Sequence, residues 1–191
     1  MEFGCGQCLG CKIVRKKTWK HRILLEAKEH VQSAFVTLTY EDEHLPKGGT
    51  LDPKDIKLFL YKLRKNVSKE YGKKIRYYFI GEYGDQNERP HYHAAIFGIG
   101  CNGPNPRDYS NKKCSCRTCT IIGKSWNMGI IGVGTLENDS ASYLAGYLNK
   151  TVKVDGEVVM GLHNKNNPKV LKWLKGRHPE FTRMSLKHTG S

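Results

Sequence analysis

Apolar residues recur at helical spacing in two segments that are rich in basic residues. Between Cys11 and Val31 the apolar positions lie three or four residues apart, which predicts a basic amphipathic helix. The second segment follows Asp52, a good N-cap, and Pro53, which suits the first helical position. Its apolar stripe consists of Ile56, Phe59, Leu60, Leu63 and Val67. A second basic amphipathic helix is therefore predicted to begin at Pro53.

Runs of β-branched and aromatic residues predict four strands. These runs are Phe35 to Tyr40, Ile75 to Tyr83, His91 to Phe97 and Ile130 to Leu136. The polar stretch between the second and third runs is typical of a hairpin loop. Caps at Asn138 to Ser140 predict a further helix that continues to about Lys150. The rest of the chain is expected to be a basic tail with one short helix, Val170 to Leu174.

The order of these elements favours a single α+β domain in which helices pack on an antiparallel sheet. A length of 191 residues also favours one domain. We expect residues 1–191 to form it, with a Cys-rich N-terminal segment at about 1–12 and a Cys-rich insertion at about 99–124. The insertion is expected to be loop-like because it combines four cysteines with two prolines.

The net charge of the chain indicates which class of molecule it binds. Thirty-two lysines and arginines oppose 18 acidic residues, which gives a net charge of +14 and a pI near 9.5. Nucleic acid is therefore the leading expected partner, and a membrane surface is the weaker alternative. No apolar run approaches the roughly 20 residues of a membrane span. Since Met1 is followed by a Cys-rich segment and not by a signal peptide, a cytoplasmic protein with reduced cysteines is expected.

Two histidines alternate on the third predicted strand. Side chains two residues apart emerge on one face of a strand, so His91 and His93 share a face with Cα atoms about 6.5 to 7 Å apart. The preceding strand offers Glu82 or Tyr83 to that face, depending on the register. With Glu82, the two imidazoles and the carboxylate suit a divalent cation that keeps positions open for a substrate oxygen. The alternative is that both histidines are ordinary, partly buried residues.

Two tyrosines and a lysine share one face of the helix that is predicted to end near Lys150. Tyr143 and Tyr147 are four residues apart and Lys150 follows three residues later, so the three lie within about 60° of arc. Leu144 and Leu148 belong to a different face, which suits packing on the sheet. A phenol can attack phosphorus and form a covalent phosphotyrosine. The alternative is that the tyrosines cover an apolar patch.

The seven cysteines form two groups of three and one remainder. The groups are Cys5, Cys8 and Cys11, and Cys114, Cys116 and Cys119. Neither group alone provides the four ligands of a structural zinc site, and Cys101 has no assigned place. Two alternatives stay open: a structural zinc, including one shared between the groups, and free thiols in a reducing cytoplasm.

Four sequence blocks together carry a family resemblance. They are Cys5 to Cys11, Phe35 to Tyr40, Gly81 to Gly84 with Arg89 to Gly98, and Ser142 to Lys150. In order and spacing they resemble the HUH-type rolling-circle replication initiators, most closely those of gokushovirus-type phages of the Microviridae. The resemblance implies the HUH endonuclease fold, which is RRM-like: an antiparallel sheet of five strands with the histidines on a central strand and the tyrosine helix packed nearby.

The resemblance also implies a role for each site residue. The implied roles are Glu82, His91 and His93 as ligands of Mg²⁺ or Mn²⁺, Tyr143 and Tyr147 as paired nucleophiles, and Lys150 as the helper at the scissile phosphate. The implied reaction nicks single-stranded DNA at a replication origin and leaves a 5′-phosphotyrosine and a free 3′-OH. Strand transfer then follows one round of rolling-circle synthesis in the bacterial host cell.

The chain carries no motif of a helicase motor. Gly123 to Ser125 is not a phosphate-binding loop, because Thr118 stands where the first glycine of that motif is required. We therefore expect a host helicase and a host DNA polymerase as partners. Phage members commonly continue beyond the position of Ser191, so a trimmed nuclease domain or a compact relative is expected. The alternative functions are a relaxase or transposase of the same chemistry, and a metal-free module that binds single-stranded nucleic acid.

Overall fold

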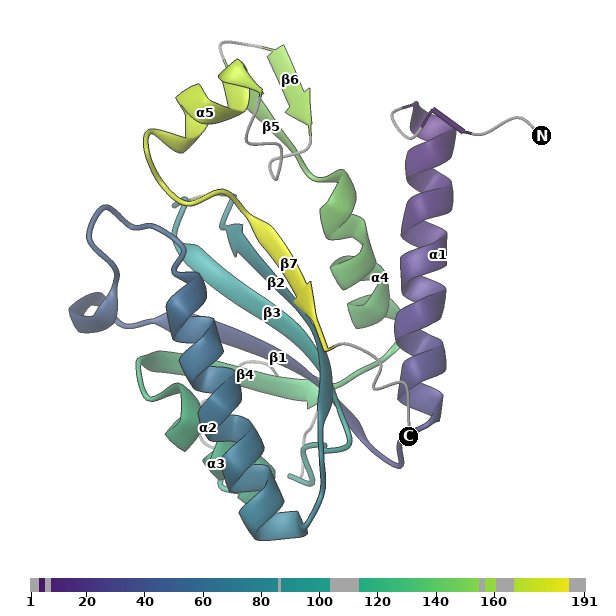
Figure 1. Ribbon diagram of the computed structural model, residues 1–191, viewed down its shortest axis with the longest axis vertical. Coiled ribbons are helices and arrows are strands. Elements are labelled where there is room, and N and C mark those ends of the chain that lie inside the picture. Colours follow the sequence, from purple (N-terminus) through teal and green to yellow (C-terminus); the bar gives the residue numbers. More distant parts are fainter. Residues whose placement is uncertain are drawn as a thin grey trace.

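An antiparallel sheet of five strands forms the centre of the protein, as the computed structural model shows (Figure 1). The structure describes residues 4–5, 8–85, 87–103, 114–154, 157–160 and 167–185. The strands of the sheet are β1 (Ser33–Tyr40), β2 (Arg76–Tyr83), β3 (Pro90–Phe97), β4 (Gly129–Thr135) and β7 (Phe181–Met184). Their order is β4-β1-β3-β2-β7, so the histidine strand β3 is central. The predicted α+β class and antiparallel sheet are confirmed.

Helices cover both faces of the sheet (Figure 1). One face carries α2 (Pro53–Tyr71) and α3 (Arg117–Trp126), and the other carries α1 (Leu9–Lys28) and α4 (Asn138–Gly146). The side chains of each strand alternate between two cores. On β1, Val36 and Leu38 join the core under α2, whereas Phe35 joins the core under α1 and α4.

Local sequence signals fix both ends of α2. A 3₁₀ turn, η1 (Asp42–His44), precedes it in the chain. The Asp52 carboxylate accepts a hydrogen bond from the N–H of Lys54 at 2.7 Å. Gly72 ends the helix with φ 62°, a left-handed conformation that glycine adopts without strain. The five predicted stripe residues are all buried, and each such side chain contributes roughly 1.5 to 3 kcal/mol of burial.

Two helices end earlier than predicted. Helix α1 ends at Lys28, and Val31, predicted on its apolar face, is exposed. Helix α4 ends at Gly146, and a 3₁₀ turn, η2 (Tyr147–Asn149), replaces the predicted last α-turn before Lys150. Glycine favours such an end because it loses more backbone freedom in a helix than any other residue.

The segment predicted to be a loop-like insertion contains α3, and this part of the prediction is wrong. Ile122 and Trp126 of α3 are buried in the core under α2, four residues apart as on a helix face. The indole N–H of Trp126 donates to the carbonyl oxygen of Thr39 at 3.2 Å. Residues 104–113 of the insertion lie outside the described residues.

The described residues of the predicted basic tail form a short helix and three strands. Helix α5 (Pro168–Leu174) begins two residues before its predicted start. Strands β5 (Thr151–Val154) and β6 (Glu157–Met160) pair with each other, and β7 completes the main sheet beside β2. These strands have four residues each, too few for a periodic pattern to reveal them. No described helix has the length and apolar character to cross a membrane.

Candidate active site

The register of the sheet brings the three predicted metal ligands to one face. Glu82 on β2 lies directly opposite His91 on β3, and His93 lies two residues further along β3. Directly opposite residues of antiparallel strands point to the same face, so all three side chains lie on the side of α1 and α4. Of the two candidates on β2, Glu82 joins this face and Tyr83 packs in the core on the other side.

Two threonines of β1 orient the histidine rings. Thr37 Oγ1 lies 3.0 Å from His93 Nδ1, and Thr39 Oγ1 lies 3.3 Å from His91 Nδ1. A hydrogen bond to one ring nitrogen fixes a histidine that ligates through the other, which leaves Nε2 as the ligand atom. These threonines were not predicted from the sequence, although Thr37 and Thr39 lie directly opposite His93 and His91 on the paired strands.

Glu82, His91 and His93 are the residues that could hold a divalent cation. Two imidazoles and a carboxylate form a donor set that binds such ions and leaves coordination positions open. His93 Nε2 lies 3.1 Å from Glu82 Oε1, and the two histidine ring centroids are 6.5 Å apart. In the part of the chain that the structure describes, only cysteine groups bring three ligand atoms within 4.8 Å of one another. The three side chains must therefore draw closer around an ion.

The protonation states of Glu82 and His91 suit cation binding. Burial raises the pKa of Glu82, but hydrogen bonds from His93 and Tyr143 and the charge of Lys150 outweigh burial and lower the pKa to about 2. Burial, together with the neighbouring His93, lowers the pKa of His91. Near pH 7 Glu82 is ionised and His91 is neutral, which are the forms that bind metal ions.

The hydroxyl of Tyr143 lies against the same set. It donates a hydrogen bond to Glu82 Oε1 and lies 3.5 Å from His93 Nε2. The tyrosine is 49% exposed, so a substrate can reach it. Partial burial, and then the hydrogen bond and charge of Glu82, raise the pKa of Tyr143. The phenol is therefore protonated near pH 7 and donates its hydrogen bond to the ionised Glu82.

Tyr147 has different surroundings, and the prediction of two phenols on one open face is wrong for it. Tyr147 is buried in the core between α4 and the sheet. Its hydroxyl donates to the carbonyl oxygen of Gly81 and to Glu180 Oε2, each at 3.1 Å. Burial and the charge of Glu180 raise the pKa of Tyr147. The hydroxyl of Tyr147 is therefore hydrogen-bonded to Glu180 and does not face the histidine pair.

Lys150 lies among three carboxylates at the edge of the site. Its Nζ is 3.4 Å from Glu82 Oε2, 3.2 Å from Asp85 Oδ1 and 3.7 Å from Glu180 Oε1. It also donates to the carbonyl oxygen of Tyr83 at 2.7 Å. Burial lowers the pKa of Lys150, but the carboxylates outweigh burial and raise it. Lys150 is therefore a fixed positive charge.

Glu180 belongs to the site, although it was not predicted from the sequence. Its Oε1 accepts a hydrogen bond from the N–H of Tyr83 at 2.8 Å, and the residue is buried. Burial raises the pKa of Glu180 to about 7. Glu180 is an isolated acid in a basic segment, and only the pairing of β7 with β2 brings it to the site. No local pattern identifies such a residue.

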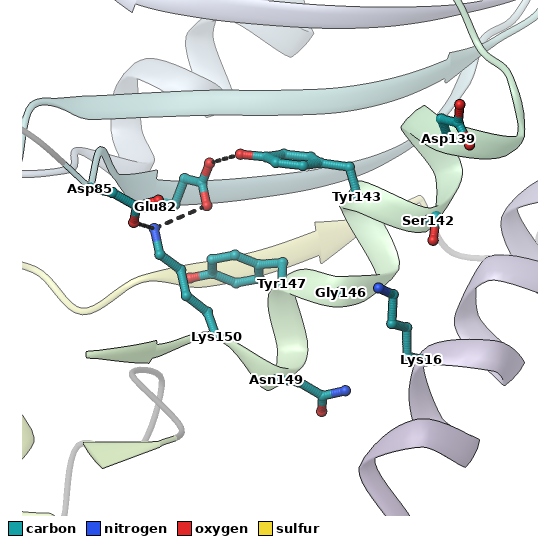
Figure 2. A pocket seen from close by; sticks show the side chains of 10 residues that line it. All are labelled: Lys16, Glu82, Asp85, Asp139, Ser142, Tyr143, Gly146, Tyr147, Asn149 and Lys150. Atoms are coloured by element: carbon teal, nitrogen blue, oxygen red, sulfur yellow. Dashed lines mark hydrogen bonds and ion pairs between the residues drawn. The ribbon is translucent and has the colours of Figure 1, made fainter. Parts of the chain in front are cut away.

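Two hollows meet at Tyr143. The larger, of about 720 Å³, lies between α1, α4 and β2 (Figure 2), and its lining residues are Lys16, Glu82, Asp85, Asp139, Ser142, Tyr143, Gly146, Tyr147, Asn149 and Lys150. Lys16 reaches from α1 to Gly146, where an added Cβ would lie 3.3 Å from Lys16 Cε. The other hollow, of about 490 Å³, is lined by Tyr143 together with residues of β1, β3 and β4. An extended anionic substrate therefore has space on both approaches to the phenol.

The cysteines form two separate groups. Cys5, Cys8 and Cys11 form one, and Cys101 joins Cys114, Cys116 and Cys119 in the other. Cys8 caps the start of α1, a helix of 20 residues that is about 30 Å long. Beyond the opposite end of α1, Gln32 Nε2 donates to Oδ1 of Asn102, the neighbour of Cys101, at 2.8 Å. A zinc ion shared between the two groups is therefore excluded, and that alternative is wrong.

Comparisons with known proteins agree with one another. Residues 33–152 match the model of the family of the replication-associated protein ORF2. The chain is 30% identical over 187 residues to Replication-associated protein VP4 of Bdellovibrio phage phiMH2K, which is 93% of this chain and 59% of the relative. It is 33% identical over 155 residues to Replication-associated protein ORF2 of Spiroplasma virus 4, which is 78% of this chain and 48% of the relative.

A third relative is Replication-associated protein ORF4 of Chlamydia phage 1, at 28% identity over 158 residues, with 76% of this chain and 37% of the relative covered. The chain thus spans less than two thirds of the length of each of these three relatives. No solved structure gives a significant match.

Proposed function

The chain belongs to the family of the replication-associated protein ORF2, and on this premise we propose that it nicks single-stranded DNA to initiate rolling-circle replication of a phage genome. The proposal rests on one observation, the contact of the Tyr143 hydroxyl with Glu82 and His93. A partly exposed phenol beside a set of cation ligands is what covalent attack on a phosphodiester requires. The names of the three relatives and the net charge of +14 also support it.

The DNA strand would pass through the two hollows that meet at Tyr143. Helix α1 borders the larger hollow and supplies Lys16 to it. The other basic residues in the first half of α1 are Lys12, Arg15 and Lys17. Contacts of such residues with phosphates give an affinity that depends little on sequence and falls steeply with salt.

The cation would be held by Glu82, His91 and His93. Bound Mg²⁺ or Mn²⁺ supplies Lewis-acid polarisation of a non-bridging oxygen of the scissile phosphate. Thr37 and Thr39 keep both imidazole rings turned with Nε2 toward the site. Glu82 is already ionised near pH 7, so it does not have to release a proton when the cation binds.

Tyr143 is the proposed first nucleophile. Its phenol oxygen forms a bond to phosphorus as the bond from phosphorus to the 3′ oxygen breaks. The phenol proton passes to solvent, and the 3′ oxygen takes a proton from solvent to become a free 3′-OH. The product on the protein is a 5′-phosphotyrosine, which keeps the phosphodiester linkage available for transfer.

Lys150 is the proposed electrostatic partner of the transferring phosphate. Its side chain is held by Asp85 and Tyr83 beside Glu82. The raised pKa keeps the ammonium charged, which favours neutralisation of the charge that builds up on the phosphate. A role of Lys150 in lowering the pKa of the Tyr143 phenol is less favoured, because that pKa is raised.

Tyr147 is the proposed second nucleophile, which acts after the first cut. Its hydroxyl must first leave the carbonyl oxygen of Gly81 and the carboxylate of Glu180. The two tyrosines would therefore act in a fixed order, with Tyr143 first. A host helicase and a host DNA polymerase, acting in the bacterial cytoplasm, would separate the strands and extend the 3′-OH between the two cuts.

Covalent capture tests this function. The protein is incubated with randomised single-stranded oligonucleotides labelled at the 3′ end, with Mg²⁺ or Mn²⁺ or with a chelator, and then boiled in detergent. We expect a labelled protein band that requires the divalent ion and is absent from Tyr143→Phe/Tyr147→Phe. Salt-sensitive binding without such a band would identify the protein as a non-catalytic module that binds single-stranded nucleic acid.

A further inference from the structure

Four cysteines converge where β3 leads into α3, away from the candidate active site. Cys101 follows β3 by four residues, Cys114 precedes α3, and Cys116 and Cys119 lie at its start. Their sulfur atoms all lie within 4.8 Å of one another. The sequence alone left Cys101 without a place, because 12 residues separate it from the next cysteine.

The sulfur distances match those around one tetrahedral ion. Cys101 Sγ lies 3.5 Å from Cys114 Sγ, 3.8 Å from Cys116 Sγ and 3.5 Å from Cys119 Sγ. Four thiolates bound to zinc at about 2.3 Å are about 3.8 Å apart in a regular tetrahedron. A disulfide joins only two sulfur atoms, at about 2.05 Å. One sulfur with three sulfur neighbours at these distances therefore fits a shared ion and not a cross-link.

The backbone next to the four sulfur atoms leaves room for them and donates a hydrogen bond to one of them. The N–H of Gly103 donates to Cys101 Sγ at 3.4 Å. A Cβ added at Gly103 would lie 2.5 Å from Cys114 Sγ, so only glycine fits against that sulfur. Cys116 is the N-cap of α3, and the N-terminal end of a helix of ten residues favours negatively charged thiolates.

We propose that Cys101, Cys114, Cys116 and Cys119 bind one structural Zn²⁺. Four thiolates in a closed tetrahedron leave no position for a substrate, so the ion has a structural role. It clamps the end of β3 to the start of α3. Since α3 carries Trp126 into the core and leads directly into β4, the ion also stabilises the attachment of β4 to the sheet.

The other cysteine group provides a matched control. Cys5, Cys8 and Cys11 number only three, and the remaining four cysteines of the chain all belong to the proposed site. In that group Cys5 Sγ and Cys11 Sγ are 4.0 Å apart. Cys5→Ser/Cys8→Ser/Cys11→Ser therefore removes a comparable number of thiols without touching the proposed site.

Metal content tests the proposal without DNA. The full chain is purified under reducing conditions from zinc-supplemented medium, and zinc is measured per chain by mass spectrometry. We expect the triple N-terminal variant to retain close to one zinc ion per chain and to lose it when Cys101→Ser is added. With Co²⁺ as the probe, the triple variant should show the visible absorption of a tetrahedral thiolate site. An unchanged zinc content after Cys101→Ser, or iron in place of zinc, would overturn the assignment.

X-ray absorption at the zinc edge of the triple variant provides a measurement that does not depend on how Cys101→Ser folds. Four sulfur neighbours at about 2.3 Å support the site. Nitrogen or oxygen neighbours, or a triple variant that binds no zinc, would overturn it. Removal of the ion by a chelator should also lower the unfolding temperature of the triple variant, since the clamp between β3 and α3 is lost.

Discussion

Glu82 and Tyr143 are 61 residues apart in the chain, and the hydroxyl of the tyrosine donates a hydrogen bond to the carboxylate of the glutamate. This bond joins β2 to α4. The same carboxylate oxygen lies 3.1 Å from His93 Nε2, and the other oxygen faces Lys150. One carboxylate thus aligns the proposed nucleophile, one metal ligand and the proposed phosphate partner. The different placements of Tyr143 and Tyr147 relative to it make their roles separable.

Tyr143→Phe is expected to reduce the covalent DNA adduct by more than roughly 100-fold, because the oxygen that attacks phosphorus is lost. Tyr147→Phe should leave the amount of the first adduct within a few-fold of wild type, because the Tyr147 hydroxyl is hydrogen-bonded to Glu180 and not directed at the cation ligands. Detergent-resistant label is the measurement, and circular dichroism checks that the helix persists. Equal losses in the two single variants would contradict the proposed order, and an adduct in Tyr143→Phe/Tyr147→Phe would place the nucleophile elsewhere.

His91→Ala and His93→Ala should each abolish nicking and leave DNA binding almost unchanged. Loss of a partner that only orients a ligand already costs roughly 10- to 100-fold in metal affinity or activity, so loss of a ligand should cost more. Binding rests on many lysines and arginines. Nicking rate against Mn²⁺ concentration, and binding by fluorescence anisotropy at several salt concentrations, separate the two effects. Full nicking by His91→Ala/His93→Ala would refute the metal assignment.

Glu180 should make the free energy of unfolding fall as pH rises from about 4.5 to about 7. In this window the folded state retains the Glu180 proton and the unfolded state has released it, so rising pH favours unfolding. The effect is on the order of 1 to 3 kcal/mol. Urea unfolding of wild type and Glu180→Gln without divalent ions measures it.

The informative quantity is the difference in the free energy of unfolding between wild type and Glu180→Gln. His91, whose pKa is lowered, acts in the opposite direction, because rising pH deprotonates the unfolded chain and favours folding. This contribution is common to both proteins and cancels to a first approximation. A difference in stability that stays constant from pH 4.5 to pH 7 would show that Glu180 titrates normally.

Gly81→Ala should destabilise the fold by about 1 to 3 kcal/mol through overpacking. Gly81 lies directly opposite Phe181 of β7, and an added Cβ would lie 2.8 Å from Phe181 Cε1. Gly123→Ala in α3 is the matched control, because its Cβ would meet only Ile131 Cδ1 at 3.5 Å. That change should stabilise the protein by up to about 1 kcal/mol. Urea unfolding tests both, and equal effects would refute the close approach of β7.

Most of the helices and strands of the fold could be predicted from local sequence. The stripe of α2 and the face shared by His91 and His93 follow from periodicities of about 3.6 and 2 residues. The Asp52 cap follows from the preference of aspartate for the N-cap position. The choice of Glu82 over Tyr83 needed the register, which local pattern leaves open.

The missed features depend on contacts between distant segments. Glu180 reaches the site through a strand of four residues, and Cys101 meets its partners across a 12-residue gap. Tyr147 has the same residue type and helical spacing as Tyr143, but its ring is packed in the core. Local periodicity describes one segment at a time, so it does not reveal which of two similar side chains a neighbouring segment will cover.

Strand β3 is paired on both sides, with β1 from His91 to Phe97 and with β2 over its whole length. Amide protons in such a strand exchange with solvent only when the sheet opens, whereas those of a single 3₁₀ turn at a helix end exchange through local fraying. Hydrogen exchange should therefore be slow at His91 and His93 and faster in η2. The passage of Tyr147 into the site would then require only the opening of one turn, while the strand that bears the histidines stays closed.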